Sequence, residues 1–92
     1  MTKPNYIVVL RCKGVPSSCG TQAALDILDE FKHRPWHRNV ECVWDGASLR
    51  LTAENDYDER GLALMDEFSD AIAPCVAESF DGSIDIFSIT VS

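Results

Sequence analysis

Hydrophobic positions along the chain follow two different periods, one typical of strands and one typical of helices. From Tyr6 to Cys12 the residues are almost continuously apolar and include several β-branched side chains, which is the pattern of a strand covered on both faces. After a break that contains Gly and Pro, apolar residues recur every three or four positions over residues 19–33, with acids on the opposite side. This spacing predicts an amphipathic helix, which Pro35 ends.

In the middle of the chain the period changes to two. Val40, Cys42 and Trp44 fall on one face of a predicted strand, and the pair Asp45-Gly46 follows directly. Alternation then resumes over residues 47–53. An Asp-Gly pair between two alternating segments predicts a tight hairpin in which both turn residues have positive φ.

A second helix is predicted after this hairpin. Asp56 is expected to cap it, because Glu59 stands three residues later, where a capping box places its acid. The helix is expected to run to about Ala73 and to kink or stop there, since Pro74 lacks an N–H and disfavours helical geometry at the residue before it.

The last predicted strand spans residues 84–91 and alternates less cleanly. Ile84 and Ile86 fall on one face and Phe87 on the other, so the pattern leaves open which face packs against the helices. The resulting order, β-α-β-β-α-β, predicts a single α+β domain over residues 1–92. We expect a ferredoxin-like plait, a four-stranded antiparallel sheet in the order 4-1-3-2 with two helices on one face. The alternative is an α+β domain in which the last strand pairs elsewhere.

Composition limits the classes of function. The chain has 92 residues, a hydrophobic share of 46% and a net charge of −7, and its positive charges concentrate in residues 1–38. An acidic total argues against nucleic acid as a ligand, because nucleic-acid affinity depends on a basic face. No apolar run approaches the length of a membrane span and no signal sequence is evident, so a cytoplasmic protein without membrane contact is expected. No cofactor is expected, because Gly14 and Gly20 fit neither G-x-G-x-x-G nor a Walker pattern.

Cys12 and Cys19 are candidate reactive thiols, because the predicted topology brings them to one pole together with Cys75. Cys19 falls in the first turn of the first helix, where unpaired N–H groups and the helix dipole lower a thiol pKa. The position of the two thiols resembles that of the metal-binding cysteines in heavy-metal-associated domains. Those domains carry a C-x-x-C pair, whereas six residues separate Cys12 from Cys19. We therefore expect neither a bound metal nor an obligatory disulfide.

The loop Lys13-Gly14-Val15-Pro16 resembles the turn that enters the first helix of ACT regulatory domains, which bind amino acids at a subunit interface. The order in those domains is Pro-Gly, and here Gly precedes Pro. The resemblance implies a small-ligand-binding regulatory domain as an alternative function.

A basic loop over residues 32–38 joins the first helix to the second strand, and the acidic segment 54–59 lies at the same predicted pole. The loop is a candidate site for an anion or an acidic partner, because exposed Trp and Arg are typical of interaction hot spots. Its candidate contacts are Arg34, Trp36, His37 and Arg38. The sequence favours a structural interpretation instead, in which the two loops attract each other and Trp36 covers the edge of the core.

The open face of the predicted sheet carries more apolar residues than a monomer requires. If alternate residues of each strand face the helices, Ile7, Val9 and Val43 lie on the open face with polar residues around them. This arrangement predicts a non-catalytic interaction module that associates through its open sheet face, as a homodimer or with a partner protein. The alternatives are a small enzyme or small-ligand-binding domain with a pocket at a dimer interface, and a thiol or metal site at Cys12 and Cys19.

Overall fold

The computed structural model describes residues 4–15, 17–76 and 83–91, and of residues 72–76 it describes the backbone alone. The order of the elements is β-α-β-β-α-β, as the sequence predicts. They are β1 (Tyr6–Lys13), α1 (Gly20–Phe31), β2 (Arg38–Trp44), β3 (Leu49–Asn55), α2 (Leu62–Val76) and β4 (Ser83–Val91).

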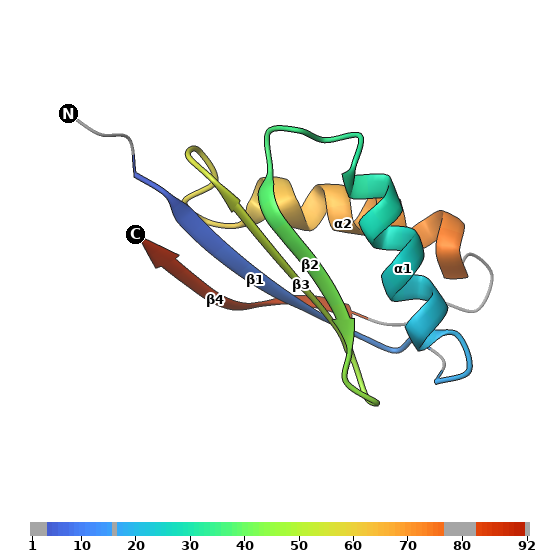
Figure 1. Cartoon of the computed structure of the whole chain (residues 1–92). Helices are drawn as coiled ribbons and strands as arrows, with labels where there is room; N and C mark the ends of the chain where they lie inside the picture. The colour runs from blue at the N-terminus through green and yellow to red at the C-terminus, as the bar shows by residue number, and fades with distance from the viewer. Residues whose placement is uncertain (1–3, 16, 77–82, 92) are drawn as a thin grey trace.

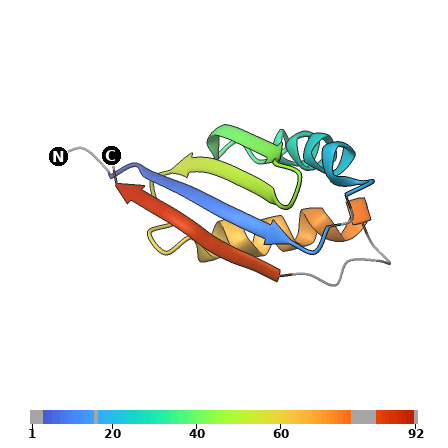
Figure 2. The ribbon, with the colours of Figure 1, turned by 90° about the horizontal axis from the view of Figure 1, so that it is seen from below.

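The four strands form one antiparallel sheet in the order β2-β3-β1-β4. This is the predicted order 4-1-3-2 read from the other edge, and it places β1 inside the sheet, where its apolar composition requires it. Figures 1 and 2 show both helices on the same side of the sheet, so that the opposite face is left open by the described residues. The α+β class and the central position of β1 are confirmed.

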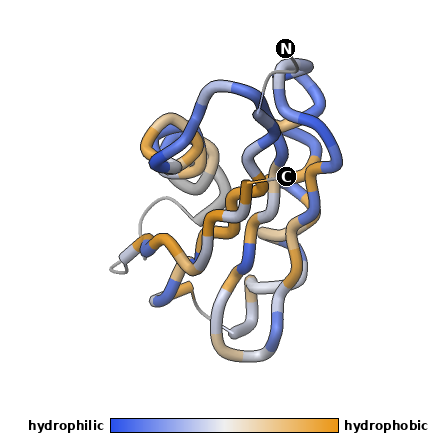
Figure 3. The backbone as a smooth tube through the Cα atoms, turned by 90° about the vertical axis from the view of Figure 1, so that its left-hand side faces the viewer, coloured by the Kyte–Doolittle hydropathy of each residue, from blue (hydrophilic) through white to orange (hydrophobic). Residues whose placement is uncertain are grey.

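The core lies between the sheet and the two helices. Side chains on a strand alternate between its faces, and the even-numbered positions of β1 together with the odd-numbered positions of β3 turn toward the helices. The largest fully buried side chains are Val8, Leu10 and Cys12 of β1, Leu49, Leu51 and Asn55 of β3, Ile27 of α1, and Leu64 and Phe68 of α2. Figure 3 shows hydrophobic positions along the strands and hydrophilic positions in several connecting loops.

The predicted hairpin between β2 and β3 is present, but its turn is longer than predicted. Residues 45–48 form a four-residue loop. The Asp45 side chain closes it, because Oδ1 accepts hydrogen bonds from the N–H groups of Ala47 (2.9 Å) and Ser48 (2.7 Å). These bonds also lower the pKa of Asp45. Gly46 has positive φ (96°) and Asp45 does not, so the two-residue turn was wrong.

α2 begins at Leu62, later than the predicted start after Asp56. The cause lies at the end of β3, where the side chain of Asn55 is buried. Its Oδ1 atom accepts hydrogen bonds from the backbone N–H groups of Tyr57 (3.2 Å) and Asp58 (2.8 Å), and these bonds turn the chain. Asp58 then replaces Asp56 as the cap. Its carboxylate accepts hydrogen bonds of 3.1 and 3.0 Å from two N–H groups in the first turn of α2.

α2 runs through Pro74 to Val76, so the expected end at Ala73 was wrong. A proline in the last turn of a helix removes one N–H but leaves the preceding turns intact. Cys75 belongs to the part of α2 described by its backbone alone, so its predicted place beside the other thiols lies outside the described side chains. In the described ranges, neither helix combines the length and the apolar composition that crossing a membrane requires.

A β-bulge in β4 explains why the last strand alternates poorly. Ser88 pairs with Val9, whereas Ile86 pairs with Leu10, so Phe87 is an extra residue between them. The bulge keeps Ile86 on the helix side of the sheet, while Ile89 regains that side beyond it. The bulge leaves Phe87 on the open face. The face of β4 that packs against the helices, which the sequence did not decide, is therefore the one with Ile86 and Ile89.

α1 packs closely on β2 at a single glycine. A Cβ atom added to Gly20 would overlap the indole ring of Trp44, which lies flat against the start of the helix. The absence of a side chain at Gly20 therefore sets how close α1 comes to the edge of the sheet.

Gly20→Ala is expected to lower the free energy of unfolding by about 1–3 kcal/mol, because the added methyl overpacks the contact with Trp44. Helix propensity alone predicts the opposite sign, a gain of about 1 kcal/mol for Ala over Gly. Chemical denaturation measures the difference, with Thr21→Ala at the exposed neighbouring position as the control. Equal stability of Gly20→Ala and wild type would contradict the close contact.

Candidate functional site

The strand register arranges the open sheet face in rows that run from β2 to β4. The first row is Val43, Arg50, Arg11 and Asp85. The second row is Glu41, Thr52, Val9 and Ser88, and the third contains Glu54, Ile7 and Thr90. Ile7, Val9 and Val43 are all on this face, with Val43 55% exposed and the other two half-buried. Their role as an interface stays a prediction.

Phe87 adds an aromatic ring to the centre of the open face. Its side chain is 49% exposed, and its ring centroid lies 5.6 Å from Cζ of Arg11 and 4.5 Å from Cζ of Arg50. Because β1 separates β3 from β4, the ring reaches across β1 to meet Arg50. Both guanidinium groups therefore lie within cation–π distance of one ring.

Arg11 and Arg50 stand directly opposite each other on β1 and β3, a position in which like charges repel. Among the described residues, neither arginine has a carboxylate within ion-pair distance. The Nε atom of Arg11 is buried without a hydrogen-bond partner in the same part of the chain. The two arginines thus form a positive centre on the open face that makes no ion pair with the described residues, although Asp85 stands opposite Arg11 and the charge of Arg50 helps to lower the pKa of Asp45.

The two edges of the sheet are less suited to association than its face. β2 carries a register shift between Arg38 and Glu41, where Asn39 has a φ of 50°, and β4 carries the bulge at Phe87. Bulges on edge strands interrupt the row of N–H and C=O groups that another strand would need. The open face is therefore the better surface for a partner.

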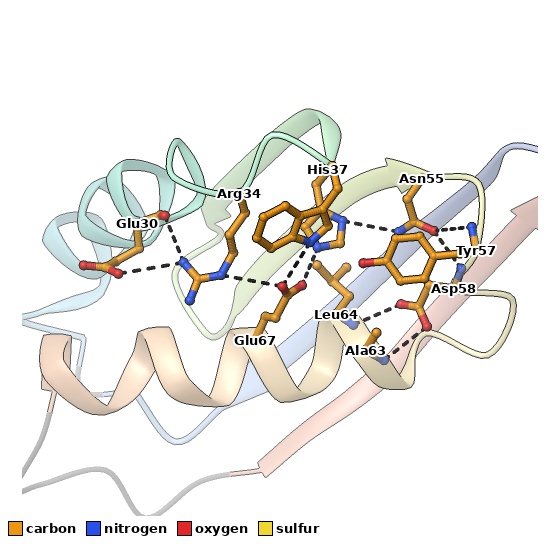
Figure 4. A network of polar contacts seen from close by, with 10 residues as sticks. Glu30, Arg34, His37, Asn55, Tyr57, Asp58, Ala63, Leu64 and Glu67 are labelled. Atoms are coloured by element: carbon orange, nitrogen blue, oxygen red, sulfur yellow. Dashed lines mark hydrogen bonds and ion pairs between the residues drawn. The ribbon is translucent and has the colours of Figure 1, made fainter.

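The basic loop is bound within the chain, mainly by one carboxylate of α2. Glu67 accepts a hydrogen bond from Trp36 Nε1 (3.1 Å), contacts His37 Nε2, and pairs with Arg34 Nε (3.7 Å). Figure 4 shows Glu67 pointing from α2 toward Arg34 and His37. Arg38 donates instead to the Asn5 side chain. The four predicted contacts thus turn their polar groups toward their own chain.

The acidic partner of the basic loop differs from the one predicted. Glu67 of α2, rather than the segment 54–59 as a whole, holds the loop. Glu54 accepts hydrogen bonds from Asn5 (2.8 Å) and Asn39 (2.8 Å), and these bonds lower its pKa. Glu67 lies far along the chain from the loop, so the pairing depends on how α2 packs and not on neighbouring sequence.

His37 is buried, and both of its ring nitrogens are occupied. Nε2 contacts Glu67, and Nδ1 lies 3.3 Å from the amide nitrogen of Asn55. The Asn55 carbonyl accepts backbone N–H bonds, so its amide nitrogen faces His37 and donates to Nδ1. This arrangement assigns the proton of the neutral ring to Nε2, and it makes His37 a structural link between α2 and β3.

The two candidate thiols have different surroundings. Cys12 is fully buried, and burial raises its pKa to about 11, so the thiol stays protonated at neutral pH and is a poor nucleophile. Cys19 is half-buried at the N-cap of α1 and makes no capping hydrogen bond through its side chain. The surroundings of Cys12 therefore favour a core role.

A groove of about 460 Å³ lies beside the basic loop, between α1 and the edge strand β2. Its walls are largely apolar, with Lys32 and Arg34 at the end nearest the loop. The lining residues are Leu25, Leu28, Asp29, Phe31, Lys32, Arg34, Pro35, His37 and Val40. The groove is a pocket within one chain, on the opposite side of the sheet from the predicted interface.

Searches of protein-family models, of curated proteins and of solved structures found no match to this chain. Its candidate sites are therefore judged on their geometry.

Sequence analysis left open on which face Phe87 lies, and it missed Arg11 on the open face and Glu67 as the centre of a network. The break in alternation at Phe87 was the signal of a bulge, since an extra residue shifts every later side chain to the other face. No local pattern marks Glu67, because its partners lie 30 or more residues away in sequence.

Glu67→Ala is expected to lower the free energy of unfolding by about 1–3 kcal/mol, because it leaves the buried His37 nitrogen without its partner. Glu67→Gln keeps a side chain of the same size and should lose less. Thermal or chemical denaturation gives the values, and Asp66→Ala, at the exposed adjacent acid, is the control. If both alanine variants are equally stable, Glu67 does not hold the loop.

Proposed function

We propose that the protein is a small non-catalytic interaction module of the ferredoxin-like type that associates with a second copy of itself through its open sheet face. The observation that carries the proposal is the composition of that face. Val43 on β2 and Phe87 on β4 are exposed, the half-buried Ile7 and Val9 lie on β1 between those strands, and Arg11 and Arg50 lie among them. Aromatic residues and arginine are enriched at protein interfaces.

The chemistry of the described side chains also supports binding over catalysis. A general base needs a nitrogen or carboxylate within reach of a substrate, and both nitrogens of His37 are occupied inside the fold. A nucleophilic cysteine needs an accessible thiolate, and burial raises the pKa of Cys12 to about 11. These groups stabilise the domain instead.

Self-association is tested by sedimentation of the purified protein over a concentration range centred on tens of micromolar. The wild type should form a dimer, and Val9→Lys or Val43→Lys should weaken it about tenfold or more, because a lysine in the centre of the interface must be desolvated. Val43→Lys is the cleaner variant, since this side chain is largely exposed and the fold does not depend on it.

Leu62→Lys is the matched control, because Leu62 is equally exposed (54%) but lies at the start of α2, away from the open face. It should leave the dimer unchanged. A wild-type protein that stays monomeric throughout the range would refute self-association.

A second candidate function is the binding of a small ligand in the groove between α1 and β2. The observation that favours it is the combination of apolar walls with Lys32 and Arg34 at one end. Lys32 is largely exposed, and in the described part of the chain its one ion pair is with Asp29 at 3.7 Å, so its charge is accessible to an incoming anion. The geometry fits a ligand with an apolar body and one carboxylate.

Octanoate and octylamine are suitable probes of the groove, since they share the same chain length and differ in charge. Octanoate should shift the amide resonances of residues that line the groove, and Leu25→Glu should abolish these shifts by placing a like charge in the wall. Octylamine should shift them less. Equal responses to both probes, or shifts spread over the whole protein, would speak against a carboxylate site.

A further inference from the structure

We infer that the cluster of Arg11, Phe87 and Arg50 is a carboxylate-binding site, and that it takes Glu41 from a second copy of the chain. The inference rests on the proposed self-association and names the contact that gives it specificity. It concerns the first two rows of the open face, where Arg11 and Arg50 are directly paired, Phe87 reaches them from the bulge of β4, and Glu41 lies on β2 in the row next to Arg50.

Two features of the cluster destabilise the isolated domain and have no role in a sheet face that only contacts solvent. Two arginines oppose each other directly across β1 and β3, which costs stability, and a buried Nε atom of Arg11 lacks a partner among the described residues. A partner's carboxylate beside the two guanidinium groups would offset their repulsion. Departures from local stability rules of this kind are expected at functional sites.

The chemistry of the cluster selects a carboxylate. Guanidinium groups bind carboxylates through paired N–H donors, and the Phe87 ring lies within cation–π distance of both groups, 5.6 and 4.5 Å from the two Cζ atoms. A ring that is 49% exposed also provides an apolar contact beside the charge. The site therefore fits an acidic side chain next to an apolar one.

The second copy carries such a pair on the same face. Glu41 is exposed on β2, two residues from the exposed Val43, and among the described residues it forms no ion pair. In a two-fold dimer the same patch faces itself, so each copy contributes both the arginines and the acid. The contact is therefore reciprocal.

The other acids on or near this face are less available. The Glu54 carboxylate already accepts hydrogen bonds from two asparagines. Asp45 lies close enough to Arg50 that the positive charge of the arginine helps to lower the pKa of Asp45. The Asp45 carboxylate, however, already accepts hydrogen bonds from N–H groups of its own hairpin. Asp85 lies directly opposite Arg11 in its own sheet. Glu41 is the acid that remains for a partner.

Exchange of charges tests the contact. Glu41→Arg and Arg50→Glu should each weaken the dimer about tenfold or more in sedimentation equilibrium, because each places like charges together. An equimolar mixture of the two variants should restore affinity close to that of wild type, since the heterodimer regains both pairs, one with the wild-type signs and one with the signs exchanged. Circular dichroism of each variant confirms that it is folded.

Glu59→Arg and Arg60→Glu are the matched controls, because both residues are exposed in the loop before α2 and give the same changes in net charge. They should leave the dimer unchanged.

If the mixture associates no better than either variant alone, the Glu41 contact is overturned. If Asp85→Arg rescues Arg50→Glu and Glu41→Arg does not, Glu41 is likewise the wrong acid. A wild-type dimer indifferent to all of these charges overturns this inference alone, whereas a monomeric wild type overturns the proposed function with it.

Discussion

The alternation of side chains along β1 is the constraint on which both the core and the open face depend. Because β1 is the interior strand that pairs with both β3 and β4, its two faces cannot be chosen independently. Once Val8 and Leu10 are buried under the helices, Val9 and Arg11 must turn to the opposite side. The core thus determines which residues the protein presents on its open face.

The helices are held over that core by polar contacts as well as by packing. Glu67 connects α2 to the loop that follows α1, and His37 continues the connection to Asn55 at the end of β3. Asn55 in turn positions the segment that leads to Asp58, which caps α2. The network closes on the helix where it began, so the orientation of α2 and the course of the basic loop stabilise each other.

This closed network distinguishes charged residues that are bound within the fold from charged residues that are not. The basic loop has the composition of a binding surface, but Arg34, Trp36 and His37 contact Glu67 within the fold, and Arg34 also lies over the Phe31 ring at 5.2 Å. Arg11 and Arg50 on the open face differ from the residues of the basic loop, because among the described residues neither forms an ion pair with a carboxylate. The proposed interface rests on this combination of arginines without ion pairs in the described part of the chain and exposed apolar side chains.

The sequence by itself determined the elements, their order and the buried face of the sheet. Apolar periodicity is a local signal, and it predicted β1, α1 and the pairing of β2 with β3, and it placed Ile7, Val9 and Val43 on the open face. Local rules failed at three places. Hydrogen bonds to the Asp45 side chain lengthened the hairpin turn, and those to the Asn55 side chain delayed the start of α2, so that Asp58 became its cap. The bulge in β4 placed Phe87 on the open face. The contacts of Glu67 and the meeting of Arg11, Arg50 and Phe87 were decided by the tertiary structure alone. They join residues far apart in sequence, and only strand register and helix packing bring such groups within bonding distance.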